Sequence, residues 1–397
     1  MAGPLDGVLV ADFSRVLAGP LCTVNLADLG ATVVKVERPG TGDDTRTWGP
    51  PWSSNGSTYF ESINRSKLSV TLDLKQEADR ALALELASRA DVLVENYRPG
   101  ALARYGLGYE EVEALNPGII YTSITGFGSA AGADLLGYDF VVQAMGGLMS
   151  ITGDPDGDPA KAGVALVDVL TGKDATIGVL AALASRTQSG HGCRVEVNLL
   201  SSLLGALVNQ AQGYLETGSA PLRMGNRHPS IAPYETLHCR DGLLAVACGN
   251  DGQFVRFAAV IGVPELSTDS RFVTNTARVA HRGELVAALE SALAGHDADT
   301  WASRLTQVQV PAGKVGTIAD GFALAERLGL APTVDVGPGH TSQVRQAITF
   351  SPELVTNPTP PPALGADTGA VRAWLTDRSD SPLSEIHQIH PTEEVHL

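Results

Sequence analysis

The chain has 397 residues, which at about 150 residues per domain suggests two to three structural units. Hydrophobic residues make up 44% and charged residues 18%, so a substantial core can form and a mainly disordered chain is excluded. The 44 acidic and 28 basic residues give a formal charge of −16, which excludes nucleic acid and anionic membrane as expected partners.

We expect a cytoplasmic protein. The N-terminal residues lack the basic and apolar regions of a signal peptide, and the longest apolar run is far shorter than the ~20 residues that span a bilayer. Four scattered cysteines, without the paired spacing of a metal site, are typical of reduced thiols. No other metal-ligand motif stands out, so no metal is expected.

The first two hundred residues alternate strand-like and helix-like patterns. Short runs rich in Val, Ile and Leu predict strands, and helical periodicity follows several of them. This alternation predicts an α/β fold with a mostly parallel, Rossmann-like sheet and helices on its faces. The predicted strands span residues 7–13, 32–40, 68–74, 91–96, 119–126 and 193–199.

Two long helices and a second domain are expected further along. The first helix covers about 169–187 and ends before Gly190, and a second follows the strand at 193–199 with leucines at helical spacing. A Gly- and Pro-rich segment then breaks the pattern. We therefore predict a large α/β domain at 1–217, a small α+β domain at 218–325, a return to the large domain at 326–378, and a disordered tail at 379–397.

Basic residues gather near the predicted strand ends. Ligands of open α/β sheets bind at the carboxyl ends of strands, and arginine is suited to phosphate oxygens. The pattern favours an anionic cofactor, with ordinary solvated charges as the alternative. The residues are Arg38, Lys67, Arg98 and Arg104.

Asp168 stands between an apolar run and the predicted helix at 169–187. One interpretation is an N-cap that accepts backbone N–H bonds. The other is a nucleophile, because a helix N-terminus favours the ionised carboxylate and such a group can attack an acyl carbon. Its position alone does not separate the two.

Common cofactor and hydrolase motifs are absent from the sequence. No GxGxxG follows a predicted strand, and neither a P-loop, an HExxH pair nor a GxSxG elbow occurs. Nucleotide-dependent redox chemistry, P-loop chemistry and serine-hydrolase chemistry are therefore not indicated.

Several long blocks resemble the family III CoA-transferases, the group of formyl-CoA transferase and carnitine CoA-transferase, which also includes the α-methylacyl-CoA racemases. The resemblance extends over almost the whole chain. The blocks include PLDGVLVADFSRVLAGP, LGATVVKVERPGTGDDTR, ADVLVENYRPGALARYGLGYEEVEALNPGIIYTSITGFG, GYDFVVQAMGGLMSITG, VDVLTG and NRHPSIAPYE.

The resemblance implies a reaction and a site. Asp168 matches the family's nucleophilic aspartate, which forms a mixed anhydride with the acyl group and then an aspartyl-CoA thioester. Asp139 matches a second acidic position, with Tyr138 beside it. Positions matching or near the CoA site are Val16, Arg38, Lys67, Asn96, Tyr97, Arg98 and Arg104.

The sequence departs from formyl-CoA transferase at Leu17, where that enzyme has an amide, so the contact to the reacting carbonyl is either absent or made by backbone N–H groups. A close counterpart of its glycine-rich lid is missing, which argues against oxalate and formate. The family also implies a homodimer of interlocked rings.

The expected function is transfer of CoA from an acyl-CoA, such as succinyl-CoA or a similar dicarboxyl-CoA, to a carboxylic acid. Arg15, Arg227 and His228 are candidates to bind a distal carboxylate, or else ordinary loop residues. One alternative is an acyl-CoA racemase, disfavoured because Tyr138 stands where racemases have histidine and a phenol is a poor base at pH 7. Another is a non-catalytic CoA-binding protein.

Overall fold

The computed structural model describes residues 3–354, 357–377 and 383, and the chain forms two compact units. Unit 1 comprises Met1–Leu148, Ala162–Ser219 and Ala331–Leu397, and unit 2 comprises Met149–Lys161 and Ala220–Leu330. Segment Met149–Lys161, which we expected in the large domain, therefore belongs to unit 2. Apart from Leu383, the tail expected to be disordered lies outside the described residues.

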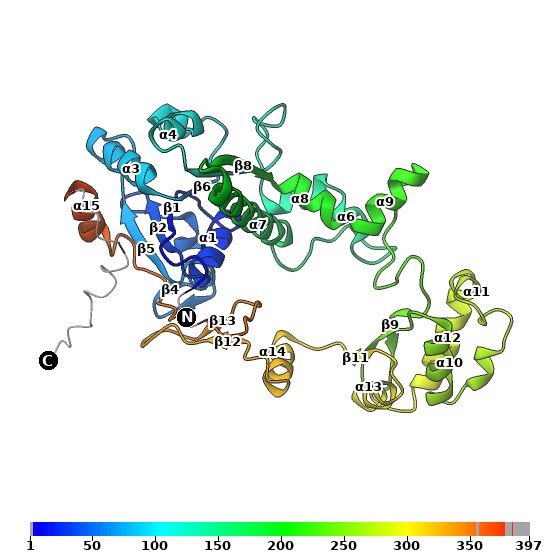
Figure 1. The fold of residues 1–397 in the computed structure, drawn as a ribbon. Helices are drawn as coiled ribbons and strands as arrows, with labels where there is room; N and C mark the ends of the chain where they lie inside the picture. The colour runs from blue at the N-terminus through cyan, green and yellow to red at the C-terminus, as the bar shows by residue number, and fades with distance from the viewer. Residues whose placement is uncertain (1–2, 355–356, 378–382, 384–397) are drawn as a thin grey trace. The chain divides into compact units, whose positions relative to one another are not determined.

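A six-stranded parallel sheet forms the centre of unit 1, which confirms the predicted α/β class (Figure 1). Its strand order is β5-β2-β1-β6-β7-β8. The central strands are buried along almost their whole length and are rich in Val, Leu and Ile, as expected for a sheet covered on both faces. The bounds are β1 Leu9–Asp12, β2 Thr32–Glu37, β5 Lys67–Thr71, β6 Val92–Glu95, β7 Ile120–Thr125 and β8 Cys193–Asn198.

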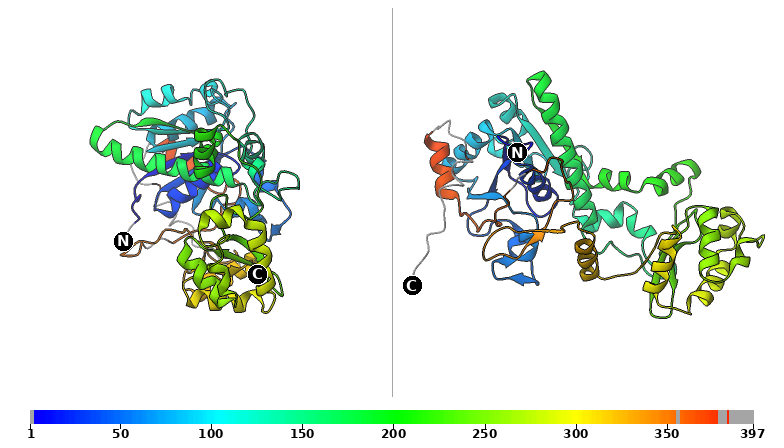
Figure 2. Two further views of the ribbon diagram at one scale, coloured as in Figure 1. Left: turned by 90° about the vertical axis from the view of Figure 1, so that its right-hand side faces the viewer. Right: turned by 60° about the horizontal axis from the view of Figure 1, so that its bottom comes forward.

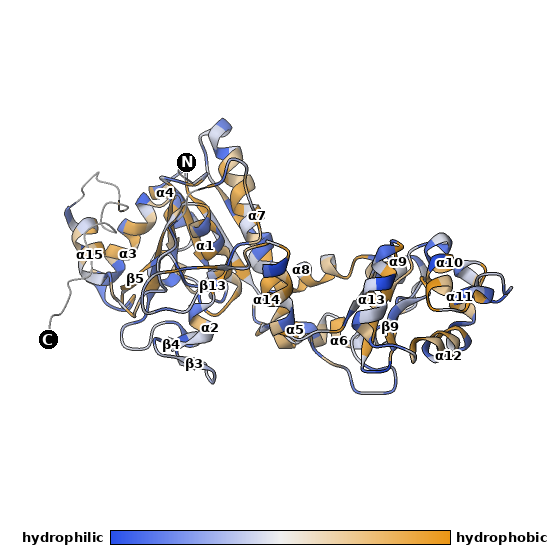
Figure 3. Ribbon diagram, turned by 90° about the horizontal axis from the view of Figure 1, so that it is seen from below, coloured by the Kyte–Doolittle hydropathy of each residue, from blue (hydrophilic) through white to orange (hydrophobic). Residues whose placement is uncertain are grey.

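Helices cover both faces of this sheet, and each face has its own hydrophobic core. One core contains residues of α1 (Ala18–Asp28), α7 (Leu166–Ser189) and α8 (Leu199–Ala206). The other contains residues of α3 (Glu77–Arg89), α4 (Tyr109–Leu115) and α15 (Thr368–Asp377). Figure 3 shows the hydrophobic stretches of α1, α3 and α7.

Two helix predictions need correction. Helix α7 begins at Leu166 rather than near Val169, and its N-cap position, Ala165, makes no side-chain capping bond. The second long helix is in fact two helices, α8 and α9 (Val208–Thr217), because the backbone of Val208 has a positive φ of 42°. The leucine spacing continues across this break, so the hydrophobic pattern gave no sign of it.

The C-terminal part of the chain completes unit 1 at the edge of the sheet. The side chains of Asp367 and Thr368 accept hydrogen bonds from the backbone N–H groups of Ser69 and Thr71 on edge strand β5, at 2.8 and 3.0 Å. These bonds satisfy donors that an edge strand would otherwise expose. Figure 2 shows α15, in red, beside α3.

Shorter elements connect the main ones in unit 1. The 3-10 turns η1 and η2 follow β2 and β6, and two small antiparallel pairs lie outside the main sheet. The bounds are η1 Asp44–Thr47, β3 Trp52–Ser53, β4 Gly56–Ser57, α2 Thr58–Glu61, η2 Ala103–Tyr105, α5 Asp139–Met145, β12 Thr333–Val334 and β13 Gln343–Val344.

Unit 2 is a small α+β structure with a three-stranded antiparallel sheet, β11-β10-β9. Its core packs aromatic side chains such as Phe254, Phe257 and Trp301 against this sheet. The bounds are α6 Leu148–Ile151, β9 Tyr234–His238, β10 Leu243–Ala247, α10 Asp251–Val260, η3 Pro264–Ser267, α11 Asn275–Ala280, α12 Arg282–Leu293, α13 Ala298–Gln307, β11 Ala312–Lys314 and α14 Ile318–Arg327.

Over the described residues, no helix of the chain combines the length and apolarity needed to cross a membrane.

Candidate active site

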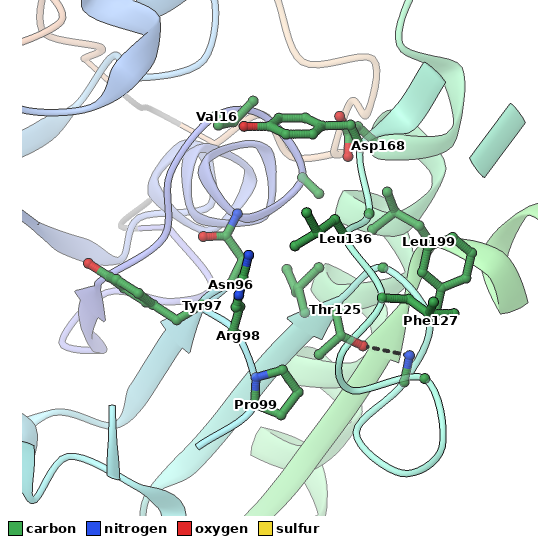
Figure 4. A pocket seen from close by; sticks show the side chains of 18 of the residues that line it. Val16, Asn96, Tyr97, Arg98, Pro99, Thr125, Phe127, Leu136, Asp168 and Leu199 are labelled. Carbon is green, nitrogen blue, oxygen red and sulfur yellow. Dashed lines mark hydrogen bonds between the residues drawn. The ribbon is translucent and has the colours of Figure 1, made fainter. Parts of the chain in front are cut away.

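A cavity of about 340 Å³ lies where three strands of the main sheet end. The segments 15–18, 96–99 and 124–128, which follow or end β1, β6 and β7, line it, and Asp168 lies at one side. Figure 4 shows Val16 and Asp168 near one end of this cavity, with Arg98 and Pro99 further along it. Ligands of open α/β folds bind at this edge, so the position itself indicates a binding site.

Asp168 is the third residue of α7, and its side chain is largely buried, with a relative exposure of 9%. Burial, together with the smaller effect of the nearby Asp139 charge, raises the pKa of its carboxyl from 3.8 to about 7. A carboxylate removed from water is a stronger nucleophile than a solvated one. Asp168 therefore combines access to the cavity with a poorly hydrated carboxyl group.

Asp139, rather than Asp168, caps helix α7. The Oδ1 atom of Asp139 accepts hydrogen bonds from the backbone N–H groups of Val167 and Asp168, at 2.7 and 3.2 Å. Its Oδ2 atom accepts one from Nε2 of Gln143 at 2.6 Å. The interpretation of Asp168 as an N-cap is therefore wrong, and its carboxylate is left for another role.

Two glycines bring the segment with Tyr138 and Asp139 against the end of β7. A Cβ atom added to Gly126 would lie 2.6 Å from the Cα atom of Gly137, and one added to Gly137 would lie 2.5 Å from that of Gly126. Only glycine allows two backbones this close. The approach fixes the start of α5, so that Tyr138 lines the cavity and Asp139 reaches α7.

The N-termini of α1 and α7 lie beside each other at the cavity. A Cβ atom on Gly172, one turn after Asp168, would lie 2.7 Å from the carbonyl oxygen of Ala18. Further along, Nδ2 of Asn25 donates a hydrogen bond to Oγ1 of Thr176 at 3.2 Å. The two helices thus run in the same direction, and the positive ends of both dipoles favour negative charge near Asp168.

Only some of the residues that we expected to bind CoA line the cavity. Val16, Asn96, Tyr97 and Arg98 line the cavity. Arg38 and Arg104 do not line it: Arg38 is half-exposed and pairs with Asp44 at 2.6 Å, and Arg104 is exposed in η2.

The prediction that Lys67 binds CoA needs correction, because its surroundings do not fit a ligand-binding role. It begins β5 instead of following a strand, and its side chain is fully buried. Its ammonium group donates hydrogen bonds to Asp12, to Asn64 and to the carbonyl of Pro20. Burial lowers its pKa to about 8 despite the neighbouring Asp12 carboxylate.

The candidates for a distal carboxylate fall into different units. Arg15 lines the cavity. Its Nη1 atom pairs with Oδ2 of Asp44 at 3.2 Å, and its Cζ atom lies 4.9 Å from the ring centre of Tyr97. Its buried Nε has no hydrogen-bond partner among the described residues. Arg227 and His228 belong to unit 2, where His228 stacks on Tyr234 at 5.1 Å.

The sequence analysis missed Tyr59, on the short helix α2. Burial raises the pKa of its hydroxyl to about 12, and the charges of Asp168 and Asp139 contribute. Tyr59 does not line the cavity, and its link to the site is this electrostatic effect of the two carboxylates. No local pattern marks it, because α2 has only four residues and the approach is made by the tertiary fold.

Comparisons with known proteins identify the family to which this chain belongs. The sequence model of CoA-transferase family III matches residues 5–368. The chain is 41% identical to the succinate–glutarate CoA-transferase of Agrobacterium fabrum, over 94% of this chain and 96% of that protein. It is 43% identical to the acetyl-CoA:oxalate CoA-transferase of Acetobacter aceti, over 82% of this chain and 84% of that protein.

A solved structure leads to the same family. A CAIB/BAIF family protein from Brucella suis superposes with a TM-score of 0.85 at 43% identity, covering 94% of this chain and 100% of that one. The family resemblance of the sequence is thereby confirmed. The chain belongs to CoA-transferase family III and is an enzyme of that class.

Proposed function

We propose that this enzyme transfers CoA from succinyl-CoA, or a similar dicarboxyl-CoA, to a carboxylic acid, with Asp168 as the nucleophile. The observation that carries the proposal is the buried carboxyl of Asp168, which does not cap helix α7 and lines the same cavity as Val16, Asn96 and Arg98. The names of the relatives from Agrobacterium and Acetobacter support dicarboxylates as the substrate class.

In each step of the proposed reaction a carboxylate or a thiolate attacks an acyl carbon and another such anion leaves, so no net proton transfer is needed. The Asp168 carboxylate attacks the thioester carbon, the C–S bond breaks, and CoA leaves as a thiolate, which gives a mixed anhydride. The thiolate then attacks the aspartyl carbon and releases the donor acid, which leaves an aspartyl-CoA thioester. The acceptor carboxylate attacks the carbonyl carbon of this thioester, the C–S bond breaks, and CoA leaves as a thiolate, which gives a second mixed anhydride. The thiolate then attacks the acceptor acyl carbon, which forms the new acyl-CoA and releases the Asp168 carboxylate.

The other residues would position Asp168, bind CoA or bind the substrate acid. Asp139 holds the first turn of α7. Burial, and to a lesser extent the charge of Asp139, raises the pKa of Asp168 to about 7, so its ionised form is more basic than an ordinary carboxylate and is still populated near neutral pH. Val16, Asn96, Tyr97 and Arg98 would bind CoA along the cavity, and Arg38 and Arg104 would meet its phosphates from outside. Arg15, Arg227 and His228 remain candidates to bind a distal carboxylate.

A homodimer is part of the proposal, and a cytoplasmic location is assumed. Helices α5, α8 and α9 of unit 1 expose large apolar side chains that a second copy would cover. Phe140, Met145, Val208 and Leu215 have exposures of 56, 63, 69 and 73%. Sedimentation velocity tests this point, and a monomer at micromolar concentration would contradict it.

Mass spectrometry of peptides after incubation with succinyl-CoA tests the mechanism. We expect an acyl or CoA adduct on the peptide containing Asp168, and none in Asp168→Ala. A panel of acceptors, including glutarate and oxalate, then defines the acid by the new acyl-CoA formed. Exchange of the α-proton in D₂O without CoA transfer would instead support a racemase, and binding of CoA without either reaction would support a non-catalytic role.

A further inference from the structure

The loop of residues 14–17, which joins β1 to α1 at the cavity, is held by side chains from four other places in unit 1. Asp12 accepts a hydrogen bond from the backbone N–H of Ser14, and Lys35 donates one to the carbonyl of Ser14, both at 2.9 Å. Asn96 accepts from the N–H of Arg15 at 2.9 Å and donates to its carbonyl at 2.7 Å.

Asp43 completes this set of contacts at Val16. Both carboxylate oxygens of Asp43 accept from the backbone N–H of Val16, at 3.2 and 3.3 Å. Five successive backbone polar groups are thus satisfied by side chains rather than by a helix or strand. We call Asp12, Lys35, Asp43 and Asn96 the loop clamp.

The clamp holds Val16 in a costly conformation. Its φ of +69° is in the left-handed region, which a β-branched residue avoids. Such a conformation costs about 1–3 kcal/mol and persists only where the surrounding structure enforces it. Strain of this kind, beside a cavity, points to a functional requirement.

The centre of the clamp is a fully buried ion pair. Nζ of Lys35 lies 2.9 Å from Oδ2 of Asp43, and neither side chain is exposed to solvent. Burial alone would lower the pKa of Lys35, but the charges of Asp12, Asp43 and Glu37 outweigh it and raise the pKa. Burial alone would raise the pKa of Asp43, but Lys35 and the hydrogen bonds of Thr45 lower it. Both groups therefore stay charged.

The loop ends beside the nucleophile. Leu17 and Ala18, which follow Val16, line the cavity, and the carbonyl of Ala18 packs on Gly172, one turn after Asp168. No hydrogen bond to the backbone N–H of Leu17 is found among the described residues. A displacement of Val16 would therefore move the start of α1, and the N–H groups there, relative to Asp168.

We propose that Asp43, held by Lys35, is a positioning residue that keeps the 14–17 loop in its strained form, so that backbone N–H groups at the start of α1 face the reacting thioester. This inference rests on the proposed CoA transfer. It also explains how a chain with Leu17, instead of an amide side chain, can contact the developing oxyanion.

The test is a kinetic comparison of Asp43→Ala with a matched control. The control is Asp28→Ala, which removes an acid from another buried pair, Asp28–Arg65, outside the clamp. Both variants lose stability, but only Asp43→Ala is expected to lose kcat, by about tenfold or more, with a change in KM for succinyl-CoA of less than about threefold. Equal kcat values for the two variants would overturn the proposal.

Rescue distinguishes positioning from general damage. Glycine adopts a positive φ without strain, so Val16→Gly in the Asp43→Ala background is expected to restore kcat by about threefold or more. The same substitution should not restore Asp28→Ala. If Asp43→Ala does not fold, Lys35→Met/Asp43→Leu takes its place, because it leaves no unpaired buried charge from this pair and still removes the contacts to Ser14 and Val16. Absence of rescue by Val16→Gly would overturn the proposal.

Amide hydrogen exchange separates this inference from the proposed function. The peptide containing Val16 should exchange faster in Asp43→Ala than in Asp28→Ala, whatever the reaction, because the N–H of Val16 loses its acceptor. If the wild-type enzyme transfers CoA from no donor, the proposed function is wrong. The comparison of amide hydrogen exchange between Asp43→Ala and Asp28→Ala then still tests the loop clamp. Equal exchange of the Val16 peptide in the two variants would refute the clamp.

Discussion

The carboxyl group of Asp168 should make the folded protein less stable at the pH at which it works. Its pKa in the folded state is about 7, whereas the ordinary value is 3.8. Between these two pH values the folded state binds a proton that the unfolded state does not, so stability falls as pH rises through this range. At 1.36 kcal/mol per pH unit, the interval corresponds to at most about 4 kcal/mol.

Replacement by Asn removes this charge while keeping the shape of the side chain. Asp168→Asn is therefore expected to be inactive and yet more stable than the wild type at pH 8, by about 2–4 kcal/mol in the free energy of unfolding. At pH 4 the carboxyl is protonated in the folded protein, and the two proteins should be nearly equal. Urea unfolding at both pH values, at fixed protein concentration, measures the difference.

A second carboxyl on the same helix provides the control. Asp174 accepts a hydrogen bond from Oγ of Ser202 at 2.6 Å, so Asp174→Asn is expected to bring no gain at pH 8. The reasoning would be refuted if Asp168→Asn were no more stable than the wild type at pH 8. A gain of the same size at pH 4 would also refute it, because the cause would then not be the charge.

Three further results are expected. The kcat/KM for succinyl-CoA should rise with pH through a midpoint near 7 and level off above it. In Asp139→Asn this midpoint should move to lower pH, because a repelling charge is lost, and an unmoved midpoint would contradict the expectation. Gly172→Ala should lower kcat and the melting temperature, since its Cβ would meet the carbonyl of Ala18, whereas Gly213→Ala, with open space around it, should raise stability by about 0.5–1 kcal/mol. Arg104→Ala should raise KM for acyl-CoA by about 5- to 10-fold without changing kcat, and the effect should shrink at high salt.

The main sheet could be predicted closely because its signal is local. Most of the six strands are short runs rich in Val, Ile and Leu, and all six appear within a few residues of the expected ends. The start of α7 could not be placed as well, since its capping group is Asp139, 28 residues earlier in the chain. The break falls at Val208, a β-branched residue that gives no local sign of a positive φ, and no proline stands near it.

The candidate site was predictable only in part, because several of its residues come together from distant segments of the chain. Asp168, Asn96 and Tyr97 belong to motifs that the family resemblance makes visible. Tyr59 and the loop clamp are brought together from separate segments, and charged residues such as Lys35 are not expected in a core. Lys67 was misjudged because a lysine at the edge of a predicted strand is normally solvated, whereas here Asp12 pairs with it in the interior.

The return of the chain to β5 has a consequence for folding on the ribosome. The bonds of Asp367 and Thr368 to β5 join residues almost 300 positions apart, and the second core also needs Val371 and Leu375. Contacts of such sequence separation form slowly, because the chain between them must first be ordered. The continuous segment Ala220–Leu330 of unit 2 can collapse as it is synthesised, while the edge of β5 stays unprotected until residues 367–375 have been synthesised. Nascent chains truncated before about residue 365 should therefore be prone to aggregate through this edge.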